Sequence, residues 1–570
     1  MTGRFRPTTT RRQPGRWAPI TAAWLAAGCS LVVDVDARVE NRCGSDDDCE
    51  RSGGLRCDRE LGMCVRPPER PMRVLLTVAA AEGRDHAAWL VGPFEVAAEG
   101  WMDLPELPPI VTVFGTTRYR GERVAARVRL RRVPPFDGAP ELSFEAPPRA
   151  SALLAADERE ADYELRVAAG ADYDVLVEPT GEQAAVLPPL RRRIGIPTGG
   201  TAARLDLDWP AELVSIRGVV VDADGVPLGG LQVRAVDAAG ELLSSTAITS
   251  VTPGSSGSFE IRLTSADAAS SFLLRLNGGP ERPLFPTMLV DPAYLIAEPE
   301  TGGVRVLVPR LEPIRYAGIV ERASGERVAG ATVELVAELH DSDTGVRGSF
   351  RTMATTVADG SFEAMLLPAR YEVVVTPPAP RDEARGSADA VLVESLRIER
   401  PATGELSGQL FTLPRAARLG GSVTAGGRPL ADATVHAAAR GTPLPEVPAA
   451  RFNRSRTVVT DRSGAFRADL DAGAYDVTVR PPPDSGFPWH VVPDLATRAD
   501  LALVHEVAMS APVPVGGRLR SADGSLGGAE VRVWVLHESD AGPPRGVEVA
   551  RATTDPRGEL LLLLPAALGR

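Results

Sequence analysis

The sequence contains no lysine: all 63 basic residues in its 570 positions are arginine. That absence excludes a lysine Schiff base, a phosphate-loop lysine, a lysine general base and an intramolecular Lys–Asn isopeptide bond. Aromatic residues make up only 5%, so hydrophobic cores must rest mainly on valine, leucine and alanine. The 75 acidic residues give a net charge of −12, and no basic stripe is present to neutralise phosphates. Nucleic acid is therefore not an expected partner.

Motifs for catalysis are also missing. The sequence has no G-x-S-x-G elbow, no H-E-x-x-H pair and no G-x-G-x-x-G after a strand. None of the six histidines has glutamate three residues later, and only His340 and His537 have aspartate there. We therefore predict a protein that is not an enzyme, with no catalytic residue, no metal site and no cofactor.

The N-terminus has the pattern of an export signal. Five arginines and no acidic residue precede the apolar stretch 17–27, which is too short to span a bilayer. The segment Leu25-Ala26-Ala27-Gly28-Cys29-Ser30 resembles the lipobox of bacterial lipoproteins. That resemblance implies removal of residues 1–28 and lipidation of Cys29. Ser30, where inner-membrane lipoproteins carry aspartate, favours an outer-membrane lipoprotein facing the periplasm or the cell surface. An ordinary cleaved signal peptide and an unprocessed chain are the alternatives.

The other four cysteines are Cys43, Cys49, Cys57 and Cys64. In an exported chain, an even number of closely spaced cysteines predicts two disulfides in a segment too small for its own core. Three pairings are possible, and the spacing does not choose between them. Zinc is the competing interpretation, but there is no C-x-x-C pair and no nearby histidine. We expect a small disulfide-rich module within residues 29–68, which resembles Cys-rich modules of surface lipoproteins.

A repeat of about one hundred residues organises the rest of the chain. Three markers define it: a glycine that opens a strand, a turn containing Asp and Gly that leads to an aromatic residue or leucine, and a closing strand of the form Tyr-x-Val-x-Val. The alternation of the closing strand is typical of a half-buried β-strand, and prolines end it. The opening glycines are Gly115, Gly218, Gly318, Gly421 and Gly517.

These markers resemble the carboxypeptidase regulatory-like domain, most closely at 218–233 and 460–479. The resemblance implies an all-β fold of tandem seven-stranded Ig-like or transthyretin-like β-sandwiches after the disulfide-rich segment, and implies no peptidase activity. The expected boundaries are 69–210 for a divergent sandwich, then 211–309, 310–412 and 413–510. Residues 511–570 form a last copy that stops before its closing strand. The unpaired edge that would result has three explanations: a truncated gene, a copy that manages without the strand, or a strand supplied by a partner.

The function that these features favour is a non-enzymatic envelope lipoprotein, a rod of sandwiches that serves as a structural, adhesion or interaction scaffold. Its expected partners are the membrane, through the lipid anchor, and another envelope protein or a polysaccharide. The alternatives are a polysaccharide-binding protein and an accessory subunit of a separately encoded enzyme. Phe487 and Trp489, in the loop after a closing strand, are the aromatic residues chosen for stacking on sugars; burial between domains is the competing explanation.

Overall fold

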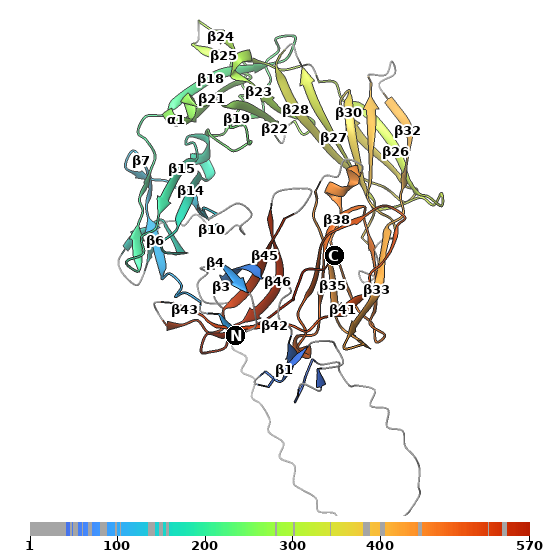
Figure 1. Cartoon of the computed structure of the whole chain (residues 1–570). Helices are drawn as coiled ribbons and strands as arrows, with labels where there is room; N and C mark the ends of the chain where they lie inside the picture. Colours follow the sequence, from blue (N-terminus) through green and yellow to red (C-terminus); the bar gives the residue numbers. More distant parts are fainter. Residues whose placement is uncertain are drawn as a thin grey trace, which may run out of the picture. The chain divides into compact units, whose positions relative to one another are not determined.

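The computed structural model describes residues 41–569, and all of them belong to one compact unit, residues 39–570. Segments outside the description are 46–47, 50–54, 60, 66–70, 80–87, 97–99, 103, 135–142, 147–151, 155–158, 280–281, 300–301, 310, 342–343, 380–387, 400–404, 443–446, 522–523 and 539–543. The fold is all-β, as the sequence predicted, and consists of β-sandwiches that follow a small disulfide-bonded segment (Figure 1). That segment contains β1 (Arg56–Asp58) and β2 (Met63–Val65).

Four sandwiches follow one another from residue 110 to residue 509. The first has β6 (Ile110–Gly115), β7 (Thr117–Tyr119), β8 (Glu122–Arg123), β9 (Ala126–Arg132), β10 (Ser143–Ala146), β11 (Ala152–Leu154), β12 (Arg159–Ala161), β13 (Tyr163–Ala168), β14 (Asp172–Pro179), η3 (Gly181–Ala185), β15 (Leu190–Gly195), β16 (Ala202–Arg204) and β17 (Leu207–Asp208). The second has β18 (Val214–Val221), β19 (Leu231–Val236), β20 (Ala247–Ile248), β21 (Ser258–Leu263), α1 (Ser265–Ala269), β22 (Leu273–Gly278), β23 (Thr287–Val290), η4 (Pro292–Tyr294), β24 (Ile296–Glu298) and β25 (Gly303–Leu307).

The third sandwich has β26 (Ile314–Arg322), β27 (Thr332–Asp341), β28 (Val346–Thr355), β29 (Ser361–Leu366), β30 (Ala369–Thr376), β31 (Leu392–Ile398) and β32 (Glu405–Leu413). The fourth has β33 (Ala417–Ala425), β34 (Arg428–Pro429), β35 (Thr434–Ala439), η5 (Pro448–Phe452), β36 (Arg456–Val459), β37 (Ala465–Leu470), β38 (Gly473–Arg480), η6 (Pro483–Ser485), β39 (His490–Thr497), β40 (Ala502–Val504) and β41 (Val507–Met509).

The fourth sandwich illustrates the common strand plan. In one sheet, β33 pairs antiparallel with β37 and parallel with β40 and β41. The other sheet has the order β36-β35-β38-β39, with every pair antiparallel. Leucine, valine and alanine side chains fill the space between the two sheets, as the shortage of aromatic residues predicts. In the other sandwiches the opening strand likewise has one antiparallel neighbour and one parallel neighbour.

Three of the opening glycines, Gly115, Gly218 and Gly421, allow that parallel neighbour to approach. A β-carbon on Gly421 would lie 1.9 Å from the carbonyl oxygen of His505, and one on Gly115 would lie 2.0 Å from that of Leu205. Any larger residue would push the two strands apart, because real β-carbons do not come so close to a backbone oxygen. The first sequence marker is therefore a requirement of sheet packing.

The turn marker also has a physical explanation. Gly464 has φ of +72°, and a β-carbon there would lie 2.4 Å from the carbonyl oxygen of Val423. The carboxylate of Asp461 accepts hydrogen bonds from the backbone N–H groups of Ser463 and Ala465, at 2.8 and 3.0 Å, which closes the turn. Gly257, Gly360 and Gly558 have φ between +77° and +78° and the same close approach to the opening strand.

A buried threonine before each of these turns ties the two sheets together. Thr460 Oγ1 accepts from the backbone N–H of Ala433 at 2.9 Å and donates to the carbonyl oxygen of Leu430 at 2.7 Å. Three more threonines make the equivalent pair of bonds: Thr249, Thr356 and Thr554. The hydroxyl satisfies a buried donor and a buried acceptor at once, which a valine could not do.

The closing tyrosines bind their own chain a few residues upstream. Tyr371 Oη accepts from the Leu367 N–H at 2.7 Å and donates to the Leu367 carbonyl oxygen at 2.9 Å. Tyr475 donates to Asp471, and Tyr173 donates to Ala168. These are tyrosine corners, in which the ring fills the core while the hydroxyl fixes the start of the strand.

The second and third sandwiches share a sheet. β23 pairs antiparallel with β28, and the pairing joins Thr287 to Ser349 through to Val290 and Val346. One sheet of eight strands therefore runs β20-β19-β22-β23-β28-β27-β30-β31. Val346 of β28 belongs to the core of the second sandwich. These two sandwiches are joined by a ladder of backbone hydrogen bonds as well as by their linker.

The last sandwich is built from both ends of the described chain. Its C-terminal strands are β42 (Val513–Arg518), β43 (Arg520–Ser521), β44 (Gly524–Ser525), β45 (Glu530–His537), β46 (Arg545–Thr553) and β47 (Glu559–Leu564), and its N-terminal strands are β3 (Met72–Ala79), β4 (Ala88–Val96) and β5 (Gly100–Met102). β3 pairs antiparallel with β45 and with β4 (Figure 1). β5 pairs parallel with β42. We call it the split sandwich.

Three sequence-based expectations are corrected by this pairing. Residues 69–210 do not form one divergent sandwich, because residues 72–102 pair with 513–537 and the first sandwich starts at β6. The sandwich formed by residues 511–570 does have a closing strand: β3 occupies the place that β38 has in the fourth sandwich. The prediction of a rod of five whole sandwiches in chain order is also wrong. β3, near the start of the described chain, lies in one sheet with β45 and β46, near its end.

Candidate functional site

The split sandwich has a single core to which both ends contribute. Val74, Leu76 and Val78 of β3 have no exposed surface and pack with Val531 and Val533 of β45. The indole N–H of Trp534 donates to Thr77 Oγ1 at 3.0 Å across 457 residues of sequence. Burying a valine or leucine side chain stabilises by about 1.5–3 kcal/mol, so the three β3 side chains contribute about 5–9 kcal/mol. That is comparable to the net stability of a typical domain.

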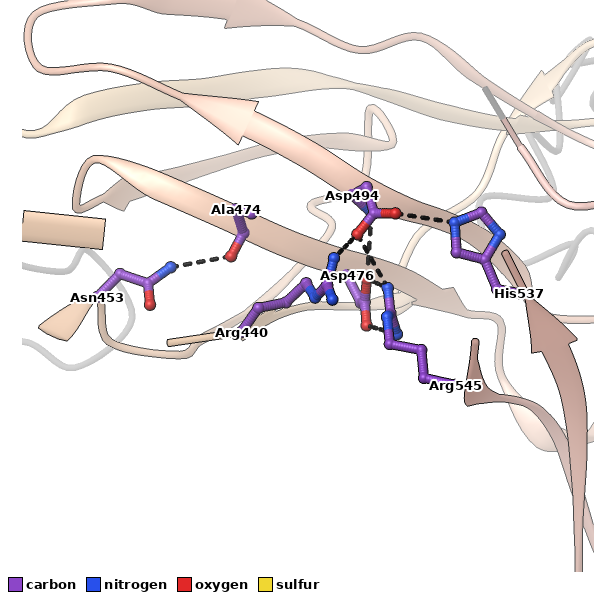
Figure 2. Close-up of polar contacts among 7 residues, drawn as sticks. All are labelled: Arg440, Asn453, Ala474, Asp476, Asp494, His537 and Arg545. Atoms are coloured by element: carbon purple, nitrogen blue, oxygen red, sulfur yellow. Dashed lines mark hydrogen bonds and ion pairs between the residues drawn. The ribbon is translucent and has the colours of Figure 1, made fainter. Parts of the chain in front are cut away.

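A cluster of charged side chains joins the split sandwich to the fourth sandwich (Figure 2). Arg545, at the start of β46, donates from Nη1 and Nη2 to the two carboxylate oxygens of Asp476 in β38, both at 2.6 Å. The same guanidinium lies 3.1 Å from Asp494 Oδ1, and Asp494 also binds Arg440. His537 Nε2 lies 2.8 Å from Asp494 Oδ2. We call these five residues the junction cluster.

A β-bulge aims Asp494 at this cluster. The pairing of β38 with β39 shifts between Tyr475 and Val477, so that two residues of β39, one of them Asp494, face a single residue of β38. Asp494 has φ of +58°, and its N–H donates to Asp476 Oδ1 at 3.1 Å. Burial, together with the charge of Arg545, lowers the pKa of Arg440. The two carboxylates offset that crowding of positive charge, so the cluster joins the two sandwiches electrostatically.

A buried carboxylate similarly links the third sandwich to the fourth. Asp471 is 2% exposed, and its two oxygens accept from Arg454 Nη2 and Nε, both at 2.8 Å. Asp471 Oδ1 also accepts from the Val391 N–H at 3.0 Å, and Arg454 donates to the Asp389 carbonyl oxygen at 3.3 Å. Between the first two sandwiches, Thr246 N–H donates to the Ala184 carbonyl oxygen. Direct bonds therefore join successive sandwiches.

The four cysteines of the N-terminal module form two disulfides, as predicted, with the pairing Cys43–Cys57 and Cys49–Cys64. The sulfur atoms of Cys43, Cys49 and Cys64 lie close together, but all three are bonded in these disulfides, which removes the zinc interpretation for the oxidised protein. Asn41 attaches the module to the fourth sandwich: its N–H donates to the Ser485 carbonyl oxygen at 2.6 Å, and its Nδ2 donates to that of Gly486 at 3.0 Å.

The predicted sugar-stacking residues are not an exposed pair. Phe487 is 8% exposed and belongs to the core of the fourth sandwich, so its assignment as a stacking residue is wrong. Trp489 packs against the core of the split sandwich, and the Arg480 guanidinium lies 4.2 Å from the centre of its ring. The competing explanation, burial between domains, fits Trp489, whereas Phe487 is buried within its own sandwich. The loop after a closing strand was a poor guide because Phe487 packs into the core of its own sandwich and Trp489 packs against the next one.

An exposed tryptophan lies elsewhere. Trp101 of β5 is 62% exposed, and a β-carbon on its neighbour Gly516 would lie 2.9 Å from the Trp101 ring. Leu561, which pairs with Gly516 from the other side, is 39% exposed. The sequence offered no signal for this arrangement, because the three residues meet only through the split sandwich.

A cleft of about 860 Å³ lies beside β18 and β21 and includes residues of η3. Its charged side chains already bind one another: Arg217 donates to Glu260 at 3.1 Å, and Arg305 pairs with Glu298. The contacts of Arg217 and Ser215 lower the pKa of Glu260 against the opposing effect of burial. The charged side chains of this cleft therefore form ion pairs with one another at the protein surface.

Cys29 and the predicted signal peptide lie outside the described residues. Within the part of the chain that is described, no helix is both long and apolar enough to cross a membrane.

No protein-family model matches the sequence, and no curated protein matches it. Among solved structures, the chain is similar to the Bacillus anthracis TIE protein over 68% of its length and 69% of that chain, at 10% identity and a TM-score of 0.17. It is similar to a streptococcal ancillary pilin over 53% of its length and 99% of that chain, at 11% identity and a TM-score of 0.18. For the shaft pilin SpaA of Lactobacillus rhamnosus GG the shares are 35% and 98%, with 11% identity and a TM-score of 0.18. TM-scores this low add nothing to the β-sandwich fold, which the strand pairing itself shows.

Proposed function

We propose that the protein is a non-enzymatic scaffold of the bacterial cell envelope, exported by residues 1–28 and held in the outer membrane by a lipid on Cys29. The observation that carries the scaffold role is the split sandwich, which ties residues 72–102 to residues 513–564. Because these two segments share one hydrophobic core, neither can unfold locally without disrupting that core. Such resistance to local unfolding suits a protein exposed to proteases outside the cytoplasm.

The anchor can be tested by expressing the full chain in a diderm bacterium supplied with labelled palmitate. The mature protein should carry the label, and mass spectrometry should find acylated Cys29 at its N-terminus. Cys29→Ser should abolish the label and release the protein from the membrane fraction, whereas Cys43→Ser should keep it. A mature N-terminus elsewhere, or an unacylated Cys29, would contradict the proposal.

Polysaccharide binding is the second candidate, and the exposure of Trp101 is what favours it. An indole ring that lies against a glycine and faces solvent offers a flat surface for a sugar ring. Pull-down on cell-wall and outer-membrane polysaccharides should then show binding that Trp101→Ala abolishes. Trp489→Ala is the matched control, because that ring is already covered by Arg480. Equal binding by the two variants, or none by the parent, would reject this candidate.

A further inference from the structure

Two histidines outside the junction cluster lie side by side at the edge of the fourth sandwich. His490 begins β39, and His505 lies between β40 and β41. On β39, Val492 points into the core of this sandwich, so His490, two residues earlier, lies on the same face. On the other strand, Leu503 and Val507 flank His505 and contribute to that core. The two imidazoles therefore come from the edge strands of the two opposed sheets.

The surroundings keep this pair close and leave a ring nitrogen without a partner. The ring centres are 6.0 Å apart, with 41° between the ring planes. Nε2 of His505 is buried and has no hydrogen-bond partner. The C-terminal tail covers the other ring: the Gly569 N–H donates to the Val491 carbonyl oxygen at 2.7 Å, and a β-carbon on Gly569 would lie 2.8 Å from His490 Nε2. A buried nitrogen without a partner calls for an explanation.

Both rings favour the neutral form. Burial, and to a smaller extent His505, lowers the pKa of His490 to about 4. Burial also lowers the pKa of His505, against an opposing effect of Glu506. The neutral imidazole, with its free electron pair, is the form that binds a metal ion.

We propose that His490 and His505 together bind one divalent first-row transition metal ion, of the class of Cu²⁺, Ni²⁺ and Zn²⁺. A metal–nitrogen bond of about 2.0–2.1 Å and a ring radius of about 1.2 Å put the ion about 3.2 Å from each ring centre. The centres of two imidazole rings on one ion are then about 5.2 Å apart when the nitrogen–metal–nitrogen angle is tetrahedral. They are about 6.4 Å apart when the two nitrogens lie on opposite sides of the ion. The observed 6.0 Å lies within this range. Water or a small anion would complete the coordination.

The sequence predicts no metal site, and the fold explains why. His490 and His505 are fifteen positions apart and match no metal-binding motif. They meet because the sandwich brings its two edge strands together. Nitrogen ligands without carboxylates favour copper, nickel or zinc over calcium or magnesium.

The test uses the full chain, without a polyhistidine tag and treated with chelator. Titration calorimetry with NiCl₂ and with ZnCl₂ should show one site, and one equivalent of Cu²⁺ should give an electron paramagnetic resonance spectrum with coupling to two nitrogen nuclei. His490→Gln and His505→Gln should each weaken binding at least tenfold. The matched control is His436→Gln, because His436 Nδ1 already bonds Thr457 Oγ1 at 2.8 Å. That variant should bind like the parent.

A second measurement does not depend on the variants folding. In the parent protein, saturating Zn²⁺ should raise the melting temperature and should protect His490 and His505 from modification by diethyl pyrocarbonate, as read by mass spectrometry of their peptides. Binding that survives in both variants, an absence of protection at the two histidines, or the absence of any saturable site would overturn the proposal.

Discussion

Buried hydroxyl groups stabilise the sandwiches through hydrogen bonds to the backbone. The repeated threonine and tyrosine each combine an apolar body with one polar atom that finds a backbone partner inside the core. Because removing such an atom leaves buried backbone groups without partners, substitutions that preserve shape are more informative than truncations to alanine.

Thr460→Val tests the threonine clamp. The substitution keeps the shape but leaves the Ala433 N–H and the Leu430 carbonyl oxygen without their partner. We expect a loss of about 1–3 kcal/mol in the free energy of unfolding, measured by urea denaturation. Thr460→Ser keeps the hydroxyl and should lose less. Equal losses in the two variants would show that the methyl group, and not the hydrogen bonds, matters.

Tyr371 should make the protein sensitive to alkaline pH. Burial raises the pKa of this tyrosine to about 12 in the folded chain, from 10.0 as its ordinary value. Between pH 10 and 12 the unfolded chain therefore binds fewer protons than the folded chain, so stability falls as pH rises through that window. The effect is of order 2 kcal/mol by pH 12.

Urea midpoints at pH 8, 10 and 11 should show this decline in the parent and a shallower decline in Tyr371→Phe. The control is Tyr294→Phe, whose ring is 50% exposed and which should follow the parent. A slope unchanged by Tyr371→Phe would contradict the assignment.

At the scale of elements, the bidentate pair of Asp476 and Arg545 links β38 to β46. A double-mutant cycle with Asp476→Ala and Arg545→Ala should give a coupling of about 1–3 kcal/mol, because both side chains are mostly buried. The control cycle uses Arg315 and Glu363, which make an equally short contact but are 54% and 61% exposed. That pair should couple by less than about 1 kcal/mol. Similar couplings in the two cycles would mean that burial adds nothing at the junction.

Strand β3 offers a matched comparison on adjacent residues. Val78 has no exposed surface, whereas Ala79 points outward. Val78→Thr buries a hydroxyl in the core of the split sandwich and should cost about 1–3 kcal/mol, while Ala79→Thr should be close to neutral. Hydrogen exchange should then accelerate in β45 and β46 but not in β27 or β30. A uniform change across the chain would contradict this local effect.

The repeat could be predicted from the sequence because its markers are local: a glycine where a parallel strand approaches, an Asp–Gly turn and a tyrosine corner each occupy a few adjacent positions. The split sandwich could not, because β3, β4 and β5 contain none of these markers and because β3 and β5 pair with strands more than 400 residues away. The junction cluster and the pair His490–His505 were missed because their members match no local motif and meet only through the folded sheets. Phe487 was misjudged because the sequence does not show which loop residues turn back into the core of their own sandwich.

At the scale of the whole molecule, the split sandwich makes the two ends depend on each other. Residues 513–564 supply one strand pair to each sheet, β45 with β46 and β42 with β47, and the remaining places belong to β3, β4 and β5. A chain that begins at residue 105 loses the buried side chains of β3 and leaves β45 with an unpaired edge. We expect its residues 513–569 to lose hydrogen-exchange protection while residues 110–509 keep theirs.

A chain that begins at residue 69 provides the control, since it lacks the disulfide module but keeps β3. It should protect residues 513–569 as the full chain does. Adding a peptide of residues 69–104 to the chain that begins at residue 105 should restore protection, because the vacant edge of β45 and the apolar face of β3 remain complementary. Full protection of residues 530–564 without that peptide would show that these C-terminal strands fold by themselves, and the closure of the chain would then add no stability to them.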